Sequence, residues 1–379
     1  MDKFNNADRE KLFENNFLDF SSENIRANYP DHISTGFDKL DSLLGGGLAP
    51  GLTILGAVSS LGKSTLSLQL AQNIAKQGIY AIYYSLEMPK HAIAMKAVQR
   101  SAFKKCKKNA VGLYEKTENS DKMKFSSDVY REIKKQALSS TDILNNDIKK
   151  EKEDLRKFAE EECKKECKNR LIVLERDLKN DSFSAEDIAG DVEWFIEKTG
   201  EKPVVFVDYL QILVSSKEKA LQEKQIVDEN IQKLWLVANQ NQIPVFVISS
   251  VNRDSYNKPI SFSAFKESGG IEFTADVVLG MQLSAVSDGI KDVNLDKEKG
   301  KDPRRVEVIV LKQRYGKSGF SANDRFIYYP EYSYFEEGDI INTESSDENK
   351  NAKNVKNKSP ETPPKSENKN GIEEEAELV

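Results

Sequence analysis

The sequence predicts an α/β fold with a mainly parallel sheet flanked by helices. Most of its apolar runs are continuously apolar, which is typical of strands buried on both faces of a parallel sheet. Amphipathic stretches lie between several of these runs and predict repeated βαβ units. The runs are LTIL (52–55), YAIYY (80–84), LIVL (171–174), VVFVD (204–208), VFVI (245–248), VVLGMQL (277–283) and VEVIVL (306–311).

Composition divides the chain into three parts. Residues 33–340 carry the apolar runs and are expected to form one domain, whereas residues 1–32 are polar and linker-like. Residues 341–379 are rich in Asn, Lys, Glu, Ser and Pro and are expected to be disordered. A charged stretch at about residues 103–170 interrupts the alternation of strands and helices. We expect a solvated helical insertion there, stabilised by ion pairs one turn apart, with a partner-binding arm as the alternative.

Composition also argues against several classes of protein. Hydrophobic residues make up 38% of the 379 residues, which supports a core, and the net charge of −6 does not indicate nucleic-acid binding. The cysteines, Cys106, Cys163 and Cys167, suit neither a disulfide framework nor, with His32 and His91, a zinc site. No apolar run is long enough to span a bilayer, and the N-terminus lacks a signal-peptide core. We expect a soluble, cytoplasmic protein without a membrane partner.

Residues 56–65, GAVSSLGKST, nearly match the phosphate-binding loop G-x-x-x-x-G-K-[ST]. Ala57 stands at the first glycine, whereas Gly62, Lys63 and Ser64 fit. A predicted strand precedes the stretch and a predicted helix follows it, which is the context such a loop needs; the alternative is a glycine turn with a solvated lysine. Lys63 would reach the β and γ oxygens, and Ser64 would hold Mg²⁺. The expected nucleotide-binding residues are Ala57, Val58, Ser59, Ser60, Leu61, Gly62, Lys63, Ser64 and Thr65.

Two carboxylates follow other predicted strands. Asp208 ends VVFVD, about 145 residues after Lys63, and is expected to coordinate Mg²⁺ through water together with Ser64. Glu87 follows YAIYYS and would act as the general base that polarises the attacking water. Each residue, considered alone, is also compatible with an ordinary capping or surface acid.

Several longer strings occur in the order found in one family. They are ISTGFDKLDSLLGGGLAPGLTILG (33–56), AVSSLGKST, YYSLEMP (83–89), VDYLQIL (207–213), ISSVNR (248–253), FKESGGIEFTADVVLG (265–280) and LKQRYGKSG (311–319). Residues 33–335 thus resemble the C-terminal motor domain of DnaB-type hexameric replicative helicases, in which alanine often replaces the first phosphate-loop glycine. The SLEM, DYLQ, ESGxIE and KxR strings favour this family over RecA recombinases. The resemblance implies a RecA-like P-loop NTPase core.

The resemblance also implies roles for individual residues. Lys63, Glu87 and Asp208 keep the roles given above, and the catalytic residues are Lys63, Glu87, Lys312 and Arg314. Lys312 and Arg314, in KQR, are expected to reach the γ-phosphate of a neighbouring subunit, where fixed positive charge would stabilise the transition state. Without the motif order, two cations after a strand are more often surface charges.

DNA binding is expected in the loops after VDYLQIL and after VFVI. Their cations would hold phosphates without reading bases, or would simply be solvated; they are Lys217, Lys219, Lys224, Arg253 and Lys258. Ser250 stands where the family usually has a glutamine thought to couple the γ-phosphate to the DNA loops, and Lys266 replaces a usual arginine. Ser250 is therefore the candidate coupling residue.

We therefore expect an ATP- and Mg²⁺-dependent helicase-like motor that translocates on single-stranded DNA in replication. It would act as a homo-oligomer, in a hexameric ring. The family's helical N-terminal domain, which contacts primase, is not matched by residues 1–32, and no loader or primase partner is identifiable. Two alternatives remain: a RadA- or KaiC-like ATPase without unwinding activity, and an ATP-gated DNA-binding or partner-recruiting module with little turnover.

Overall fold

The computed structural model describes residues 31–114, 127–145, 147–175, 183–215, 222–252, 258–265, 268–288, 294–314, 316 and 325–338. All of these belong to the first of two units, residues 1–340; the second unit is residues 341–379. The expected disordered tail and nearly all of the expected N-terminal linker lie outside the described residues. Among the described residues, no helix is both long and apolar enough to cross a bilayer.

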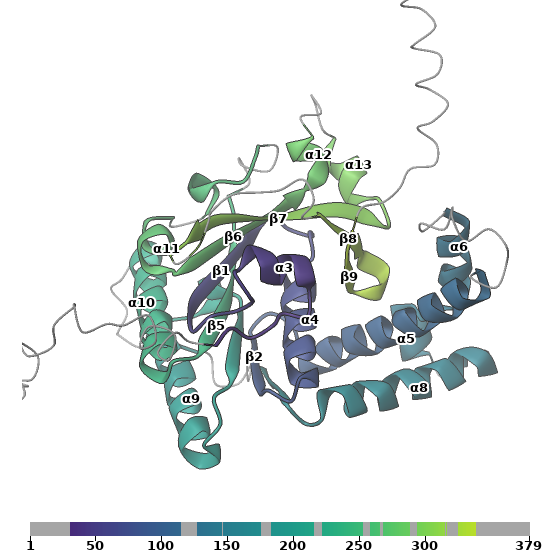
Figure 1. Ribbon diagram of the computed structural model, residues 1–379, viewed down its shortest axis with the longest axis horizontal. Coiled ribbons are helices and arrows are strands. Elements are labelled where there is room, and N and C mark those ends of the chain that lie inside the picture. The colour runs from purple at the N-terminus through teal and green to yellow at the C-terminus, as the bar shows by residue number, and fades with distance from the viewer. Residues whose placement is uncertain are drawn as a thin grey trace, which may run out of the picture. The chain divides into compact units, whose positions relative to one another are not determined.

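The strands of the described residues form one nine-stranded sheet in the order β3-β2-β4-β5-β1-β6-β7-β8-β9 (Figure 1). The first six strands in this order run parallel. The predicted α/β fold and its seven strands are therefore confirmed. The strands are β1 (Gly51–Ala57), β2 (Ala81–Ser85), β3 (Leu171–Glu175), β4 (Val204–Asp208), β5 (Pro244–Ser250), β6 (Val277–Leu283), β7 (Arg304–Gln313), β8 (Arg325–Tyr329) and β9 (Tyr334–Glu337).

One edge of the sheet differs from the sequence prediction. The β7, β8 and β9 strands are antiparallel, and the short β8 and β9 strands were not predicted. Antiparallel neighbours can be joined by a short connection, as β8 and β9 are, so the alternation of strands and helices that indicates βαβ units does not mark these two strands. Their aromatic side chains are buried by distant residues: Tyr329 packs on Phe103, with ring centroids 4.8 Å apart.

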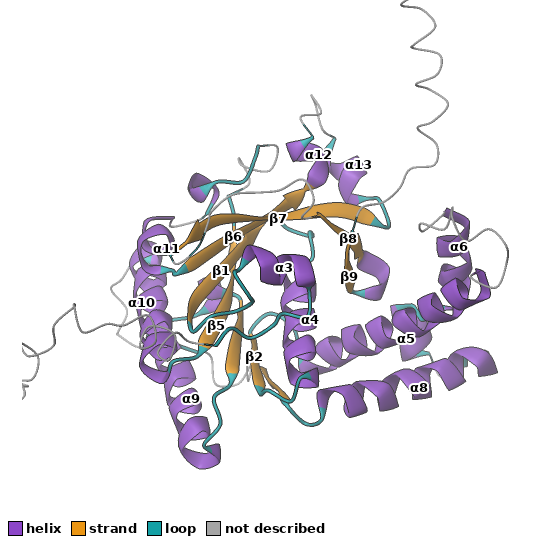
Figure 2. Ribbon diagram, in the orientation of Figure 1, coloured by secondary structure: helices purple, strands orange, loops and turns teal. Residues whose placement is uncertain are grey.

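Helices cover both faces of the sheet (Figure 2). One core lies between the sheet and α3 (Asp38–Leu43) and α4 (Lys63–Lys76), and the other between the sheet and α9 (Ala185–Thr199), α10 (Glu223–Asn241) and α11 (Ser268–Thr274). Neighbouring side chains of a strand enter opposite cores, as the pleat requires. On β2, for example, Tyr83 enters the α4 core and Tyr84 enters the α9–α10 core.

The expected helical insertion contains the second half of α5 (Lys90–Tyr114), followed by α6 (Ser127–Gln136), α7 (Ser140–Leu144) and α8 (Lys150–Cys167). The α5 helix begins well before residue 103 and runs beside α8 (Figure 1). Glu153 of α8 pairs with Arg156 and Lys157 at 2.6 and 3.2 Å, one turn away. The helix also has an inner side, because Ala159 is fully buried against α5 and Leu138.

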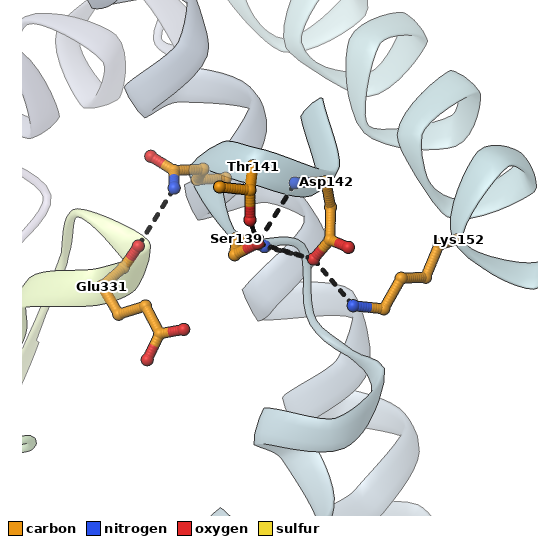
Figure 3. A network of polar contacts seen from close by, with 6 residues as sticks. Ser139, Thr141, Asp142, Lys152 and Glu331 are labelled. Carbon is orange, nitrogen blue, oxygen red and sulfur yellow. Dashed lines mark hydrogen bonds and ion pairs between the residues drawn. The ribbon is translucent and has the colours of Figure 1, made fainter. Parts of the chain in front are cut away.

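A polar network connects these helices to the antiparallel edge of the sheet (Figure 3). Ser139 and Asp142 cap α7 reciprocally, and Lys152 of α8 donates to Asp142 at 2.7 Å. Gln99 of α5 is buried and donates to the backbone carbonyl of Glu331, in the turn between β8 and β9, at 3.1 Å. The helical unit therefore contacts the same strands that pack on the phosphate loop.

Candidate nucleotide site

The phosphate loop joins β1 to α4, and Gly62 is the residue that caps the helix. Its φ of +93° lies in the left-handed region that favours glycine. A Cβ atom on Gly62 would lie 2.7 Å from the Tyr328 ring and 2.9 Å from the Phe335 ring, which stack on each other. Both the backbone conformation and the packing of β8 and β9 therefore require glycine here.

Ala57 occupies the place of the first consensus glycine without strain. It is the last residue of β1 and pairs with β5 on one side and β6 on the other, so its backbone is extended. The preceding Gly56 is the more constrained position, because a Cβ there would lie 2.3 Å from the Phe265 ring. Packing against Phe265 thus explains why the glycine lies one residue early.

The remaining loop residues divide between the core and the surface. Val58, Leu61 and Thr65 are buried, and the Thr65 hydroxyl lies 3.4 Å from that of Tyr328; Ser59 and Ser60 are exposed. Lys63 begins α4, and its Nζ donates to the carbonyl of Ala57 at 2.8 Å. The first-turn N–H groups of a helix and a lysine folded over the same loop form an anion-binding arrangement.

Asp208 ends β4 and is almost completely buried beside the first turn of α4. Its Oδ2 accepts a hydrogen bond from the Tyr83 hydroxyl at 2.8 Å, and its Oδ1 accepts none from the described residues. Burial raises the pKa of the Asp208 carboxyl, while hydrogen bonds from Ser64 and Tyr83 oppose that rise. A buried carboxylate oxygen without a protein partner, next to a serine hydroxyl, fits a divalent cation.

Tyr83 is a site residue that the sequence analysis missed. Its hydroxyl lies 2.9 Å from that of Ser67 on α4, so it bridges the phosphate-binding helix and Asp208. Burial, and then the nearby Asp208, raise the pKa of Tyr83, so it stays a neutral donor. The alternation along YAIYYS puts Tyr83 and Tyr84 on opposite faces, but no sequence signal shows which face holds α4.

Glu87 is exposed and lies two residues beyond β2, at the same edge of the sheet. Ser85 pairs with Asp208 in the β2–β4 register, and the Leu86 N–H donates to the Asp208 carbonyl at 2.9 Å. These contacts hold the start of the Glu87 loop against the end of β4. An exposed carboxylate close to Asp208, at the end of β4, is chemically suited to act as a general base for water.

Ser250 ends β5 opposite Ala57, so it also borders the phosphate loop. A second residue lies across the same strand end: Gln211 accepts the Ser250 N–H at 3.1 Å and donates to the Ser249 hydroxyl at 2.9 Å. Gln211 belongs to the short 3-10 helix Leu210–Ile212, which follows β4. One amide side chain therefore connects the chain after β4 to the end of β5.

Arg304 was also missed. It begins β7, its guanidinium lies over the Tyr328 ring at 5.4 Å, and it donates to the Ser60 carbonyl at 3.0 Å. Arg304 thus supports the exposed turn of the phosphate loop from the antiparallel edge. The sequence contained no signal for this contact, because 244 residues separate the two partners.

Lys312 and Arg314 lie toward the opposite, amino-terminal edge of the parallel strands. Across β6, Lys312 of β7 is level with Ile54 in the middle of β1. Arg314 lies further out, because its N–H donates to the Asp276 carbonyl and the Asp276 N–H donates to Leu52, at the start of β1. The phosphate loop follows the other end of β1. Within one chain, Arg314 and the phosphate loop are therefore separated by most of the length of a strand.

The predicted DNA-binding cations are only partly described. Lys224 is exposed in the first turn of α10, and Lys258 is exposed after β5. Lys217, Lys219 and Arg253 lie outside the described residues. The described chain enters both loop regions from the carboxyl edge of the sheet, where β4 and β5 end.

The fold and the site define a RecA-like P-loop ATPase core. A family model of the DnaB-like helicase C-terminal domain matches residues 32–174 and 130–337, and the chain belongs to this family. Its structure is similar to that of a solved ATPase domain, with a TM-score of 0.60 and 17% sequence identity, over 84% of this chain and 95% of that one. It is also similar to a solved DnaB-like replicative helicase, with a TM-score of 0.56 and 17% identity, over 88% and 68% of the two chains. These likenesses concern the fold.

Two curated relatives extend the comparison. The chain is 30% identical over 252 residues to the replicative DNA helicase DnaB of Leifsonia xyli subsp. xyli, which covers 65% of this chain and 46% of that protein. It is 26% identical over 302 residues to a probable replicative DNA helicase of Trieres chinensis, over 77% and 56% of the two chains. This chain therefore spans about half the length of these curated relatives.

Proposed function

We propose that the chain hydrolyses ATP at the carboxyl edge of its sheet. The phosphate loop and the first turn of α4 bind the phosphates, with Lys63 turning from the Ala57 carbonyl to the β and γ oxygens. Ser64 and Asp208 hold Mg²⁺, which neutralises phosphate charge when bound. Glu87 orients and deprotonates the attacking water. The buried Oδ1 atom of Asp208, which has no hydrogen-bond partner among the described residues, is the observation that carries this assignment.

We propose further that Lys312 and Arg314 act on the nucleotide of a neighbouring copy. Their position toward the amino edge supports this assignment, because Asp276 holds Arg314 there, at 2.9 Å, far along the sheet from its own phosphate loop. A head-to-tail contact would bring the amino edge of one copy to the carboxyl edge of the next. Such contacts close into a ring, for which membership of the family supports six copies.

The motor's substrate is proposed to be single-stranded DNA, as the relatives' description as replicative DNA helicases suggests. The loops that follow β4 and β5 would contact the DNA backbone, with Lys217, Lys219, Lys224, Arg253 and Lys258 neutralising phosphates. Ser250 and Gln211 lie where these loops begin, beside the phosphate loop. They would transmit the presence or absence of the γ-phosphate to the loops that contact DNA.

The test is the ATPase rate with and without single-stranded DNA, measured alongside mass in solution and strand separation on a forked duplex. We expect DNA-stimulated hydrolysis by an oligomer. Hydrolysis with stimulation but without strand separation would support the RadA- or KaiC-like alternative. Nucleotide binding with negligible turnover under all conditions would support the recruiting module.

A further inference from the structure

Phe273 is the most exposed large hydrophobic residue among those that the structure describes. Its exposed fraction is 78%, compared with 73% for Leu144, 63% for Trp194 and 40% for Leu236. It lies in α11, whose inner side is fixed by the fully buried Ile271. Two residues after an inward residue, a helical position points outward, so Phe273 has no place in the core of its own chain.

Phe273 and the two cations at the amino edge form one continuous surface. Lys312 Nζ donates to the backbone carbonyls of Glu272, at 2.5 Å, and Phe273, at 3.4 Å. Partial burial, and then the nearby Arg314, lower the pKa of Lys312. We call Phe273, Lys312 and Arg314 the amino-edge patch. A surface that touches the Lys312 ammonium therefore also lies close to the exposed residue Phe273.

We infer that Phe273 is the apolar anchor through which the amino-edge patch docks on a second copy of this chain. This inference rests on the proposed function. It adds to the proposed contact between copies a residue that contributes apolar contact area and has no catalytic charge. The complementary surface is the carboxyl edge, where Glu87 and Pro89 are both exposed in one short loop. A carboxylate near an apolar ring matches a patch that combines cations with an aromatic ring.

Aromatic residues in such surfaces often dominate the contact because their large apolar area is removed from water at a small entropy cost. The other exposed hydrophobic residues do not share this position. Trp194 projects from α9 and Leu144 from α7, and neither helix contains a residue assigned to the nucleotide site. They therefore provide matched controls for a general effect of apolar surface.

The test compares Phe273→Ala, Phe273→Leu and Trp194→Ala in the full chain. Mass in solution would be measured over a range of protein concentrations, with a non-hydrolysable ATP analogue and Mg²⁺. We expect Phe273→Ala to raise the midpoint concentration of assembly by about tenfold or more, equivalent to about 1.4 kcal/mol per contact. Phe273→Leu should recover part of this loss, and Trp194→Ala should assemble like the wild type. Nucleotide binding and melting temperature of dilute, unassembled chains should be the same in all variants.

Four results would overturn the inference. One is assembly of Phe273→Ala at the same concentration as the wild type. The proposal of a shared nucleotide site would still hold in that case if Lys312 and Arg314 variants lose activity. Another is an equal loss in Trp194→Ala, because the effect would then be general. A third is a wild-type chain that stays monomeric at all concentrations, which would remove the proposed ring as well. A lowered melting temperature confined to Phe273→Ala would also count against an anchor that is exposed in the single chain.

Discussion

Asp276 fixes Arg314 at the amino edge of the sheet through two contacts. Its Oδ1 pairs with the Arg314 guanidinium at 2.9 Å, and its carbonyl accepts the Arg314 N–H at 2.9 Å. The other carboxylate oxygen, Oδ2, accepts the Leu52 N–H of β1, also at 2.9 Å. One buried acid thus connects the start of β1 to the residue that follows β7. It also fixes the position of Arg314, the arginine proposed to act on a neighbouring copy.

Replacing Asp276 with alanine should therefore lower the stability of the fold as well as release Arg314 from its position. The Leu52 N–H would lose its buried acceptor, which costs about 1–3 kcal/mol of unfolding free energy. Asp276→Asn keeps an acceptor oxygen and should recover part of the loss. Urea unfolding measures the effect, with Glu132→Ala, which removes an exposed pair with Lys135, as the control expected to unfold at the same midpoint as the wild type. Equal midpoints for Asp276→Ala and the control would refute the role.

Substitutions at Lys63 and Glu87 should separate binding from turnover. Lys63→Ala should lose both nucleotide binding and hydrolysis, because the cation that reaches the phosphates is gone. Glu87→Gln should still bind ATP while its turnover falls by about 10²–10⁴-fold, because only water activation is lost. Fluorescent-nucleotide titration and phosphate release give the two readouts. Wild-type turnover by Glu87→Gln would show that another group is the base.

Mixed subunits test whether the site is shared. Glu87→Gln and Arg314→Ala should each be inactive, and mixing them before assembly should restore ATPase activity. About a quarter of randomly formed head-to-tail contacts would join an intact phosphate loop and Glu87 to an intact Arg314. The matched control mixes Glu87→Gln with Lys63→Ala, which damage the same side of the contact and should not restore each other. Proven mixing without recovery, at several ratios and with ample single-stranded DNA, would argue that Arg314 does not act in trans.

Glu307 predicts a specific pH dependence of stability. It is fully buried on β7, accepts a hydrogen bond from the Ser287 hydroxyl at 2.5 Å and faces Arg325 at 3.4 Å. Burial raises its pKa above the ordinary value of 4.5, despite these contacts. The folded state thus binds the proton more tightly than the unfolded state. The contribution of Glu307 to the free energy of unfolding therefore falls as the pH rises through the raised pKa.

Glu307→Gln removes this charge and should remove this part of the pH dependence. The unfolding free energy of the variant, relative to the wild type, should increase as the pH rises above 4.5 and through the raised pKa of Glu307. Urea unfolding at several pH values across this range measures the difference, and Glu132→Gln is the exposed control. Parallel pH profiles for the wild type and Glu307→Gln would contradict the prediction.

Charge reversal at Lys217 and Lys219 tests the predicted DNA loops. The double Lys→Glu variant should bind single-stranded DNA more weakly, and the slope of log affinity against log salt should fall by about 0.7 per lost phosphate contact. Lys164 and Lys165 are exposed on α8, so reversing them makes the same change in net charge away from the loops. Equal losses in the two variants would indicate a general electrostatic effect and leave the loop assignment unsupported.

The sequence alone determined the features that depend on local pattern. Continuous apolar runs marked the seven strands, and Gly62, Lys63 and Ser64 marked the phosphate loop, because strand burial and loop conformation follow from residues that are neighbours in the chain. The placement of Asp208 beside that loop followed from one further rule, that parallel strands end at a common edge of the sheet. The order of longer strings then indicated the family.

Tertiary structure decided the features that depend on contacts between distant residues. The β8 and β9 strands are stabilised by packing on α5 and on Gly62, so their own sequences carried little signal. Tyr83 lies in the site only because its side chain projects from β2 on the face of the sheet that α4 covers. The separation of Arg314 from its own phosphate loop depended on β7 running antiparallel to β6, a pairing set by burial and hydrogen bonding across the sheet and by no local pattern.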